Sequence, residues 1–222
     1  MSITVIIVVL TCVVSFVAFS NQKIINDLIF YPPAISERNQ WYRFITHGFI
    51  HADIMHLAFN MIALYSFGEI VEKYLYSNPC VFGEKGPIFY TLLYLGGLIF
   101  ATTPSYAQNK DNYQYRSLGA SGAVSAVVFA GILLIPQMPI RFVFIPVDIP
   151  GIVFGALYLI VSAYLSKKGS GTINHSAHFW GSAFGVIFTV VCVYMFGKLN
   201  VLENFINQVR SFGQILPFDC GL

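Results

Sequence analysis

Residues 169–197 read GSGTINHSAHFWGSAFGVIFTVVCVYMFG, a stretch without Asp, Glu, Lys or Arg. An α-helix rises ~1.5 Å per residue, so about 20 apolar residues cross the ~30 Å hydrocarbon core of a lipid bilayer. This stretch exceeds that length and is rich in Phe, Val and Gly. It therefore predicts a membrane-spanning helix.

Five further stretches of the chain have the same apolar character. Because no water reaches backbone groups inside a bilayer, each stretch has to satisfy its own hydrogen bonds, and we expect it to be helical. The first stretch is not a secretory signal peptide, since it lacks a basic start and its apolar run is long for one. The six predicted spans are residues 3–20, 54–73, 87–107, 118–136, 149–166 and 175–197.

The composition favours the same class of protein. The 222 residues are 56% hydrophobic and only 10% charged, whereas an ordinary soluble domain has roughly 25% charged residues. This excludes a soluble enzyme, a disordered chain and a small disulfide scaffold. The net charge of +2 is too small to indicate a nucleic-acid partner. We predict an all-α, multi-pass membrane protein with one helical bundle in residues 1–197 and a tail in residues 198–222.

Neither a disulfide framework nor a metal site is predicted. The four cysteines show no CxxC or Cys/His spacing, and they stand at Cys12, Cys80, Cys192 and Cys220. No cluster of carboxylates and histidines has the spacing of metal ligands, so we expect no cofactor. Asp53 and Asp148 each precede a predicted span, where a short acceptor side chain caps the first free N–H groups of a helix. We therefore expect both to be helix caps.

The second predicted span carries a polar pair near its start. If all six spans cross the membrane, the second, fourth and sixth start on the same side, so residues near these starts can meet at one depth. His56 and Asn60 are four residues apart and share one helix face. Polar residues at membrane depth are costly and are candidates for function. The alternative is that the pair only holds two helices together by hydrogen bonds.

The starts of the fourth and sixth spans carry a serine and a histidine among small residues. Ser121 stands in the sequence Gly119-Ala120-Ser121-Gly122, where a helix N-terminus favours a developing negative charge. His178 lies one turn before Gly181 on nearly the same face. Gly181 and Gly185 form a small-xxx-small pair that lets another helix approach closely. The alternative for both segments is helix packing without chemistry.

Together these residues fit nucleophilic catalysis. A serine becomes a good nucleophile when a base lies within hydrogen-bond reach, and donors are needed for the oxyanion that forms. We therefore predict Ser121 as the nucleophile and His178 as the base. The predicted oxyanion donors are His56, Asn60 and the Ser121 N–H. No acidic residue suits a third catalytic position, so the prediction is a dyad.

At this point the sequence resembles the rhomboid intramembrane serine proteases. The resemblance starts at Tyr42-Arg43 and Thr46, continues through HADIMHLAFN at residues 51–60 and includes Gly68 and Glu72. GASG at residues 119–122 and AHFWGSAFG at residues 177–185 match the family's serine and histidine motifs. The three motifs occur in order on spans two, four and six, and the resemblance covers residues 3–197.

The resemblance implies a six-transmembrane-helix rhomboid-like bundle that cleaves transmembrane protein substrates in or near the bilayer. It implies the same dyad of Ser121 and His178, the same oxyanion donors, and no cofactor. The first loop would lie sideways in the membrane. The fifth span and the loop at residues 167–174 would act as gate and cap.

Two positions depart from the family pattern. Several family members have an aromatic residue four positions after the nucleophile, packed on the catalytic histidine, where this chain has Ser125. The ring of His178 then needs another support, such as Tyr158 or Phe154 from the fifth span. Tyr76 stands where the family often has glycine, which we interpret as a change in a turn.

Two other classes of protein compete with the protease. One is a catalytically inactive rhomboid-like protein that binds membrane clients. The other is a small transporter or channel with His56, Asn60 and His178 along a polar path, although no inverted repeat is visible. The resemblance places the N-terminus in the cytoplasm, in the plasma (inner) membrane if the organism is bacterial. The distribution of Lys and Arg favours the opposite orientation.

Overall fold

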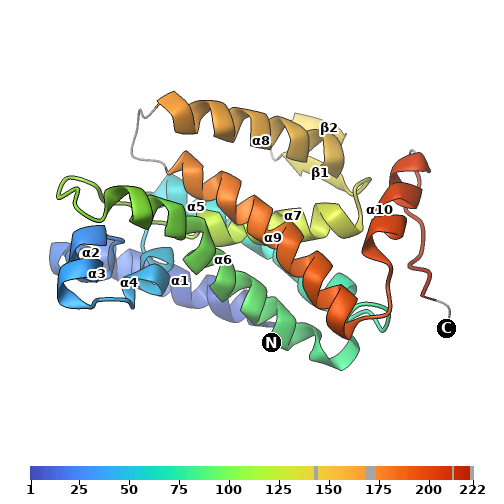
Figure 1. The fold of residues 1–222 in the computed structure, drawn as a ribbon, viewed down its shortest axis with the longest axis horizontal. Coiled ribbons are helices and arrows are strands. Elements are labelled where there is room, and N and C mark those ends of the chain that lie inside the picture. The colour runs from blue at the N-terminus through green and yellow to red at the C-terminus, as the bar shows by residue number, and fades with distance from the viewer. Residues whose placement is uncertain (143–144, 169–173, 212, 221–222) are drawn as a thin grey trace.

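The protein is a bundle of apolar α-helices, seen in a computed structural model that describes residues 1–142, 145–168, 174–211 and 213–220 (Figure 1). Six helices form the body of the bundle: α1 (Ile3–Phe19), α5 (Ile54–Glu69), α6 (Gly86–Asn109), α7 (Ser121–Leu134), α8 (Gly151–Lys168) and α9 (His175–Phe196). A π-helical segment, η2 (Ile70–Tyr76), continues α5, and a short 3-10 turn, η3 (Gly83–Lys85), precedes α6. The predicted fold class, a helical membrane bundle, is confirmed.

Three of the helical segments are long and apolar enough to cross a bilayer on their own, namely Ile54–Tyr76, Gly83–Asn109 and His175–Phe196. The other three apolar helices are shorter: Ile3–Phe19, Ser121–Leu134 and Gly151–Ser166. Six crossings therefore remain a prediction. The helices begin at residues that suit a helix start. The side chains of Ser2, Asp53 and Asn174 accept backbone N–H groups of α1, α5 and α9, so the expected cap at Asp53 is confirmed.

Helix α7 is the centre of the bundle. Every residue of α7 after Ser121 is buried, and α5, α6, α8 and α9 all contact it. Its most extensive contacts are with α9 and α6. In Figure 1, α8 lies along one side of the bundle and α1 along the other. A helix that is hydrophobic on all sides is typical of such a central position.

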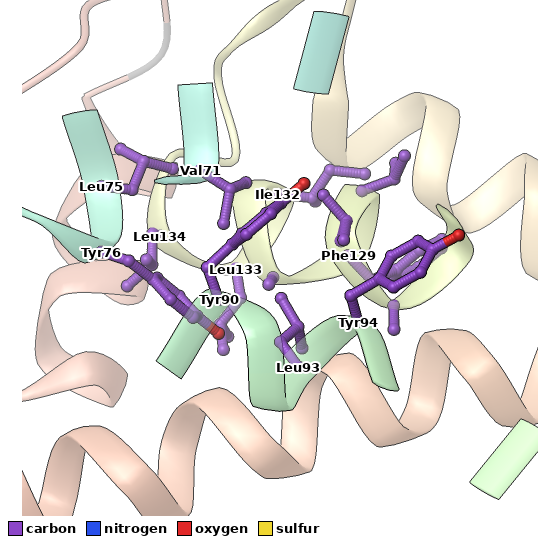
Figure 2. Close-up of a cluster of buried hydrophobic side chains, with 14 of the residues drawn as sticks. Val71, Leu75, Tyr76, Tyr90, Leu93, Tyr94, Phe129, Ile132, Leu133 and Leu134 are labelled. Carbon is purple, nitrogen blue, oxygen red and sulfur yellow. The ribbon is translucent and has the colours of Figure 1, made fainter. Parts of the chain in front are cut away.

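The hydrophobic core lies between η2, α6 and α7. Figure 2 shows the rings of Tyr76, Tyr90 and Tyr94 among aliphatic side chains such as Val71 and Leu133. All three tyrosines are fully buried. The Tyr76 hydroxyl bonds the Thr189 hydroxyl at 2.6 Å and so connects η2 to α9. Tyr76 is therefore a core residue, and the interpretation of this position as a mere change in a turn was wrong.

The long segment between α1 and α5 folds into short helices: α2 (Gln22–Leu28), α3 (Pro32–Arg38), α4 (Arg43–Thr46) and η1 (His47–Phe49). Phe30 and Ser117 exchange two backbone hydrogen bonds of 3.0 and 3.1 Å, which attach this segment to the chain just before α7. The buried Arg43 guanidinium donates to the carbonyls of Asn26 and Ile29. Arg43 is thus part of the interior of the segment.

A β-hairpin separates α7 from α8, which the sequence did not predict. Strands β1 (Pro139–Phe142) and β2 (Ile145–Pro150) pair in antiparallel register, with Ile140 opposite Ile149. The expected helix cap at Asp148 was wrong, because Asp148 lies in β2 and forms a bidentate ion pair with Arg141 at 2.7 Å. Arg141 lowers the pKa of this carboxyl. Proline at both ends of the hairpin and the β-branched residues between them favour strands over helix.

The C-terminal tail folds back onto the bundle. Helix α10 (Val201–Arg210) follows α9, and the Asn204 amide donates to the Leu134 carbonyl at the end of α7. Lys198 and Leu199 donate their N–H groups to the Cys80 carbonyl. Beyond α10, a disulfide joins Cys80 and Cys220, whose Cα atoms are 5.6 Å apart. The prediction that no disulfide forms was wrong, because a separation of 140 residues carries no spacing signal.

This pairing predicts how many thiols react. Protein purified without reductant and then unfolded in detergent should bind maleimide at Cys12 and Cys192 only, because both are free thiols. After reduction, Cys80 and Cys220 should react as well. Intact mass spectrometry counts the added groups. A Cys220→Ser variant should add one reactive thiol without reduction, and reaction of every cysteine in unreduced wild-type protein would contradict the pairing.

Candidate active site

Ser121 is the first residue of α7, and its hydroxyl lies where a helix N-terminus is free of intrahelical partners. The backbone turns into the helix through Gly119, which has φ +112°, a conformation that favours glycine. An added Cβ at Gly119 would lie 2.7 Å from Cε1 of His56, so the imidazole packs directly on this backbone. The sequence between Gly119 and Gly122 therefore makes a tight entry to the helix with Ser121 at its tip.

His178 lies on the first turn of α9, and its Nε2 is 2.8 Å from Oγ of Ser121. The two residues are 57 positions apart in the chain and come from two neighbouring helices. Both side chains are half-buried. The structure thus brings together the serine and the histidine that the sequence predicted as a pair, at the distance of a hydrogen bond.

Glycines of α9 allow this approach. A Cβ added at Gly181 would overlap the carbonyl oxygen of Gly122, and one added at Gly185 would overlap that of Ala126. Gly122 itself packs on the Ala101 side chain of α6. The backbones of α7 and α9 are therefore in direct contact along two turns. This contact fixes the distance between the helix that carries Ser121 and the helix that carries His178.

His56 and Asn60 lie on the first two turns of α5, beside the entry to α7. His56 packs on Gly119, two residues before Ser121. One N–H of the buried Asn60 amide donates to the His56 carbonyl at 3.0 Å. Within the described residues, no hydrogen bond joins His56 or Asn60 to Ser121. An Asn amide has two N–H donors, so the hydrogen bond to His56 leaves the second N–H of Asn60 for another acceptor.

Sequence reasoning missed two other histidines, His47 and His51, which hold the backbone in front of Ser121. The Gly119 N–H donates to the His47 carbonyl at 2.9 Å. The Ala120 N–H points at Nε2 of His51 at 3.4 Å. His51 is the first residue of the motif at residues 51–60, and this position was the sequence signal that could have marked it as a site residue.

The hydrogen bonds of His51 define a neutral ring. The Ser15 hydroxyl donates to the Phe49 carbonyl, so Nδ1 of His51 has to donate to Ser15, at 3.0 Å. Nε2 is then free to accept from Ala120. Burial lowers the pKa of His51 to about 3, with His56 adding to the effect. Burial likewise lowers the pKa of His47 to about 4. The backbone before Ser121 is therefore held by the neutral imidazole of His51 and by the main-chain carbonyl of His47.

The ring of Tyr158, from α8, stacks on the His178 ring with a centroid distance of 5.9 Å and an interplanar angle of 23°. Its hydroxyl bonds Oγ of Ser125 at 2.7 Å. Of the two aromatic residues considered from the sequence, Tyr158 is therefore the one that packs on His178. Phe154 packs against Tyr158 instead, at 5.8 Å.

A small cavity lies next to Ser121. Its lining residues include His47, Thr102, Ser117, Ser121 and Asn174. Its volume of about 10 Å³ is close to the least that holds one water molecule. Nε2 of His47 is buried without a hydrogen-bond partner among the described residues. Of the segment expected to act as a cap, residues 169–173 lie outside the described residues.

The fold and the site together define a helical membrane protein with a Ser–His pair half-buried at one end of its central helices. The family model of the Rhomboid domain matches residues 38–195, which include every candidate site residue. The chain belongs to the rhomboid family.

Several curated proteins are similar to the chain. RHOMBOID-like protein 12, mitochondrial, of Arabidopsis thaliana is 32% identical over 158 residues, or 64% of this chain and 44% of that protein. Rhomboid-like protein 11, chloroplastic, of the same plant is 29% identical over 154 residues, or 66% and 51%. Rhomboid-related protein 1 of Caenorhabditis elegans is 26% identical over 190 residues, or 79% and 45%.

The chain spans about half the length of these relatives. Two of them are named for mitochondria and the chloroplast, so these names give no support to the plasma-membrane location expected from the sequence. The family and the apolar helices show an integral membrane protein.

Proposed function

We propose that this chain is an intramembrane serine endopeptidase that cleaves transmembrane proteins with a dyad of Ser121 and His178. The observation that carries the proposal is the 2.8 Å contact between Nε2 of His178 and Oγ of Ser121 at the start of a central helix. A base within hydrogen-bond reach is what turns a serine hydroxyl into a nucleophile. Membership of the rhomboid family supports the same chemistry.

In the proposed reaction, Ser121 and His178 act in two steps. Oγ of Ser121 attacks the substrate carbonyl while Nε2 of His178 takes the hydroxyl proton. His178 then gives that proton to the leaving amine, and an acyl-enzyme remains on Ser121. A water molecule, deprotonated by His178, hydrolyses the acyl-enzyme and returns the serine to its starting state. No metal or redox group is needed for these steps.

We infer the donors for the oxyanion from the groups beside Ser121. The first N–H groups of a helix have no intrahelical acceptor, so the Ser121 N–H is available at the start of α7. His56, packed on Gly119, and the second N–H of Asn60 would supply further donors. The His51 ring and the His47 main-chain carbonyl act through the backbone of residues 119–120, to which they are hydrogen-bonded.

The length of α7 supports a site inside the bilayer. Its 14 residues extend only ~21 Å, against ~30 Å for the hydrocarbon core. Ser117, Gly119 and Ala120, just before Ser121, are buried. Backbone hydrogen bonds join Ser117 to Phe30 and Gly119 to His47, so the backbone next to Ser121 is enclosed by protein, as backbone at membrane depth has to be. A substrate helix would have to unwind to present a carbonyl there, since its backbone is otherwise bonded within the helix. We therefore infer substrates with weak helix formers at the cleavage site.

A fluorophosphonate probe tests the proposal directly, since it reacts only with an activated serine. Detergent-solubilised wild-type protein should be labelled covalently on Ser121, identified by peptide mass spectrometry. An inactive client-binding protein or a transporter has no activated serine, so the absence of labelling in folded protein would favour those classes.

The Asn60→Ala variant tests the oxyanion hole. We expect kcat to fall about 10²-fold, the usual cost of one lost oxyanion donor. The change also removes a hydrogen bond within α5, to the His56 carbonyl, whose net contribution is only about 1 kcal/mol. Cleavage kinetics on a single-span substrate measure the first effect, and thermal unfolding measures the second. A lower melting temperature with unchanged kcat would instead support the helix-glue interpretation.

A further inference from the structure

The orientation of the His178 ring depends on packing. Nε2 of His178 faces Ser121. Within the part of the chain that the structure describes, no hydrogen bond holds Nδ1, so no third residue fixes the ring through that nitrogen. The remaining contacts are with rings. Tyr158 stacks on His178 at 5.9 Å, and His175 meets it edge-on at 5.5 Å.

Tyr158 is itself held at both ends. Its hydroxyl bonds Ser125, which is only 4% exposed and lies one helical turn after Ser121 on the same face of α7. Its ring packs against Phe129 and Phe154, each at 5.8 Å. The opposite flank of α8 exposes large apolar side chains such as Leu157 and Ile160. Tyr158 is thus a specific contact of a peripheral helix with the site.

We propose that Tyr158 is a positioning residue for His178, and that Ser125 holds it in place. This inference rests on the proposed function. The nucleophile comes from α7, the base from α9 and the ring that supports the base from α8. Helix α8 contacts both α9 and α7. The base is therefore oriented while α8 is docked on these two helices, so the docking of a peripheral helix and the readiness of the dyad are linked.

Replacing the ring tests this role. Tyr158→Leu should lower the rate constant of fluorophosphonate labelling and kcat about tenfold each, because a freely rotating imidazole spends less time facing Ser121. KM should stay within about twofold, since no substrate contact is lost. Tyr164→Leu is the matched control, because Tyr164 lies on the same helix and is 60% exposed. Its labelling rate should equal that of the wild type.

The hydrogen bond is tested by a double-mutant cycle. Tyr158→Phe keeps the ring and loses the hydroxyl, and Ser125→Ala removes the same bond from the other side. Each should slow labelling by about two- to threefold. The double variant should be no slower than either single variant, because both changes remove one interaction. Fully additive effects would contradict the role given to Ser125.

A rescue experiment moves the ring from α8 to α7. Ser125→Phe in the Tyr158→Leu background places an aromatic side chain one turn after Ser121, in the space that the tyrosine vacates. Labelling should recover most of the lost rate. Thermal unfolding of each variant shows what fraction is folded, and rates are given per folded molecule.

The outcomes separate the two proposals. If wild-type protein is labelled and Tyr158→Leu is labelled equally fast per folded molecule, with only its melting temperature lowered, then Tyr158 is structural and this inference is wrong. A Ser125→Phe, Tyr158→Leu variant no faster than Tyr158→Leu would also overturn it. Failure of the folded wild-type protein to react at all would instead overturn the proposed function.

Discussion

The Ser121→Ala variant should fold as the wild type does and lose cleavage almost completely. In a serine protease the removal of the nucleophile lowers kcat by on the order of 10⁶-fold, and the oxyanion donors alone retain little of the rate. The half-buried Ser121 hydroxyl contacts His178 at the start of α7, and its loss leaves no core cavity of consequence. Cleavage of a single-span substrate in detergent or liposomes measures the effect, with circular dichroism to check the fold.

The matched control is Ser162→Ala. Ser162 is also a serine of an apolar helix and is 3% exposed, but it lies on α8 and is not part of the site. We expect this variant to cleave at the wild-type rate. Turnover by Ser121→Ala at even a tenth of the wild-type rate would refute Ser121 as the nucleophile.

His178→Ala should be as inactive as Ser121→Ala, and the double variant should be no worse. Nucleophile and base act as one unit, so their separate losses do not add. A His178→Ala variant that keeps substantial labelling by the probe would mean that another base serves Ser121. The nearest alternatives would be His56 or His175, which lie beside the pair.

Much of the site could be predicted from the sequence because its signals are local. Ser121 stands between glycines at the start of an apolar run, and His178 stands one turn before Gly181. A helix period of 3.6 residues places such neighbours on one face without further information. The parity of the predicted spans then suggested that these starts meet, and the 2.8 Å contact agrees with that expectation.

Other features depended on contacts between distant segments. The disulfide of Cys80 with Cys220 needs the fold of the tail, and no spacing rule connects cysteines so far apart. The β-hairpin was missed because residues 137–148 fell between two predicted spans, and a short apolar run of this kind does not by itself distinguish a strand from another conformation. His51 holds the backbone before Ser121 through the N–H of Ala120, which is 69 residues away in the chain. Sequence periodicity describes single elements and carries no such partner information.

The Gly181→Ala variant is expected to have the second large effect. The new Cβ would overlap the Gly122 carbonyl oxygen, which is backbone and cannot rotate aside. Helices α7 and α9 would have to separate by on the order of 1 Å to restore ordinary contact distances. A misplacement of that size in a catalytic pair costs about 10²-fold in rate. Because Gly181 lies one turn from His178, the displacement occurs where the dyad is held.

Substitutions at two other glycines show whether the effect of Gly181→Ala comes from displacing His178 or only from lower stability. In Gly185→Ala the new Cβ would overlap the Ala126 carbonyl, one turn further along α9. Overpacking should lower the stability of Gly181→Ala and Gly185→Ala by a similar amount, about 1–3 kcal/mol. The rate should fall less in Gly185→Ala, because Gly185 is further from His178. The atoms nearest to a Cβ added at Gly155, on α8, are side-chain atoms of Ile132 and Phe129 at 3.3 Å or more, so Gly155→Ala should cleave normally. Melting temperatures and labelling rates of the three variants separate the two effects. Equal losses of labelling in Gly181→Ala and Gly185→Ala at equal stability would contradict the proposal that the contact at Gly181 sets the distance between Ser121 and His178.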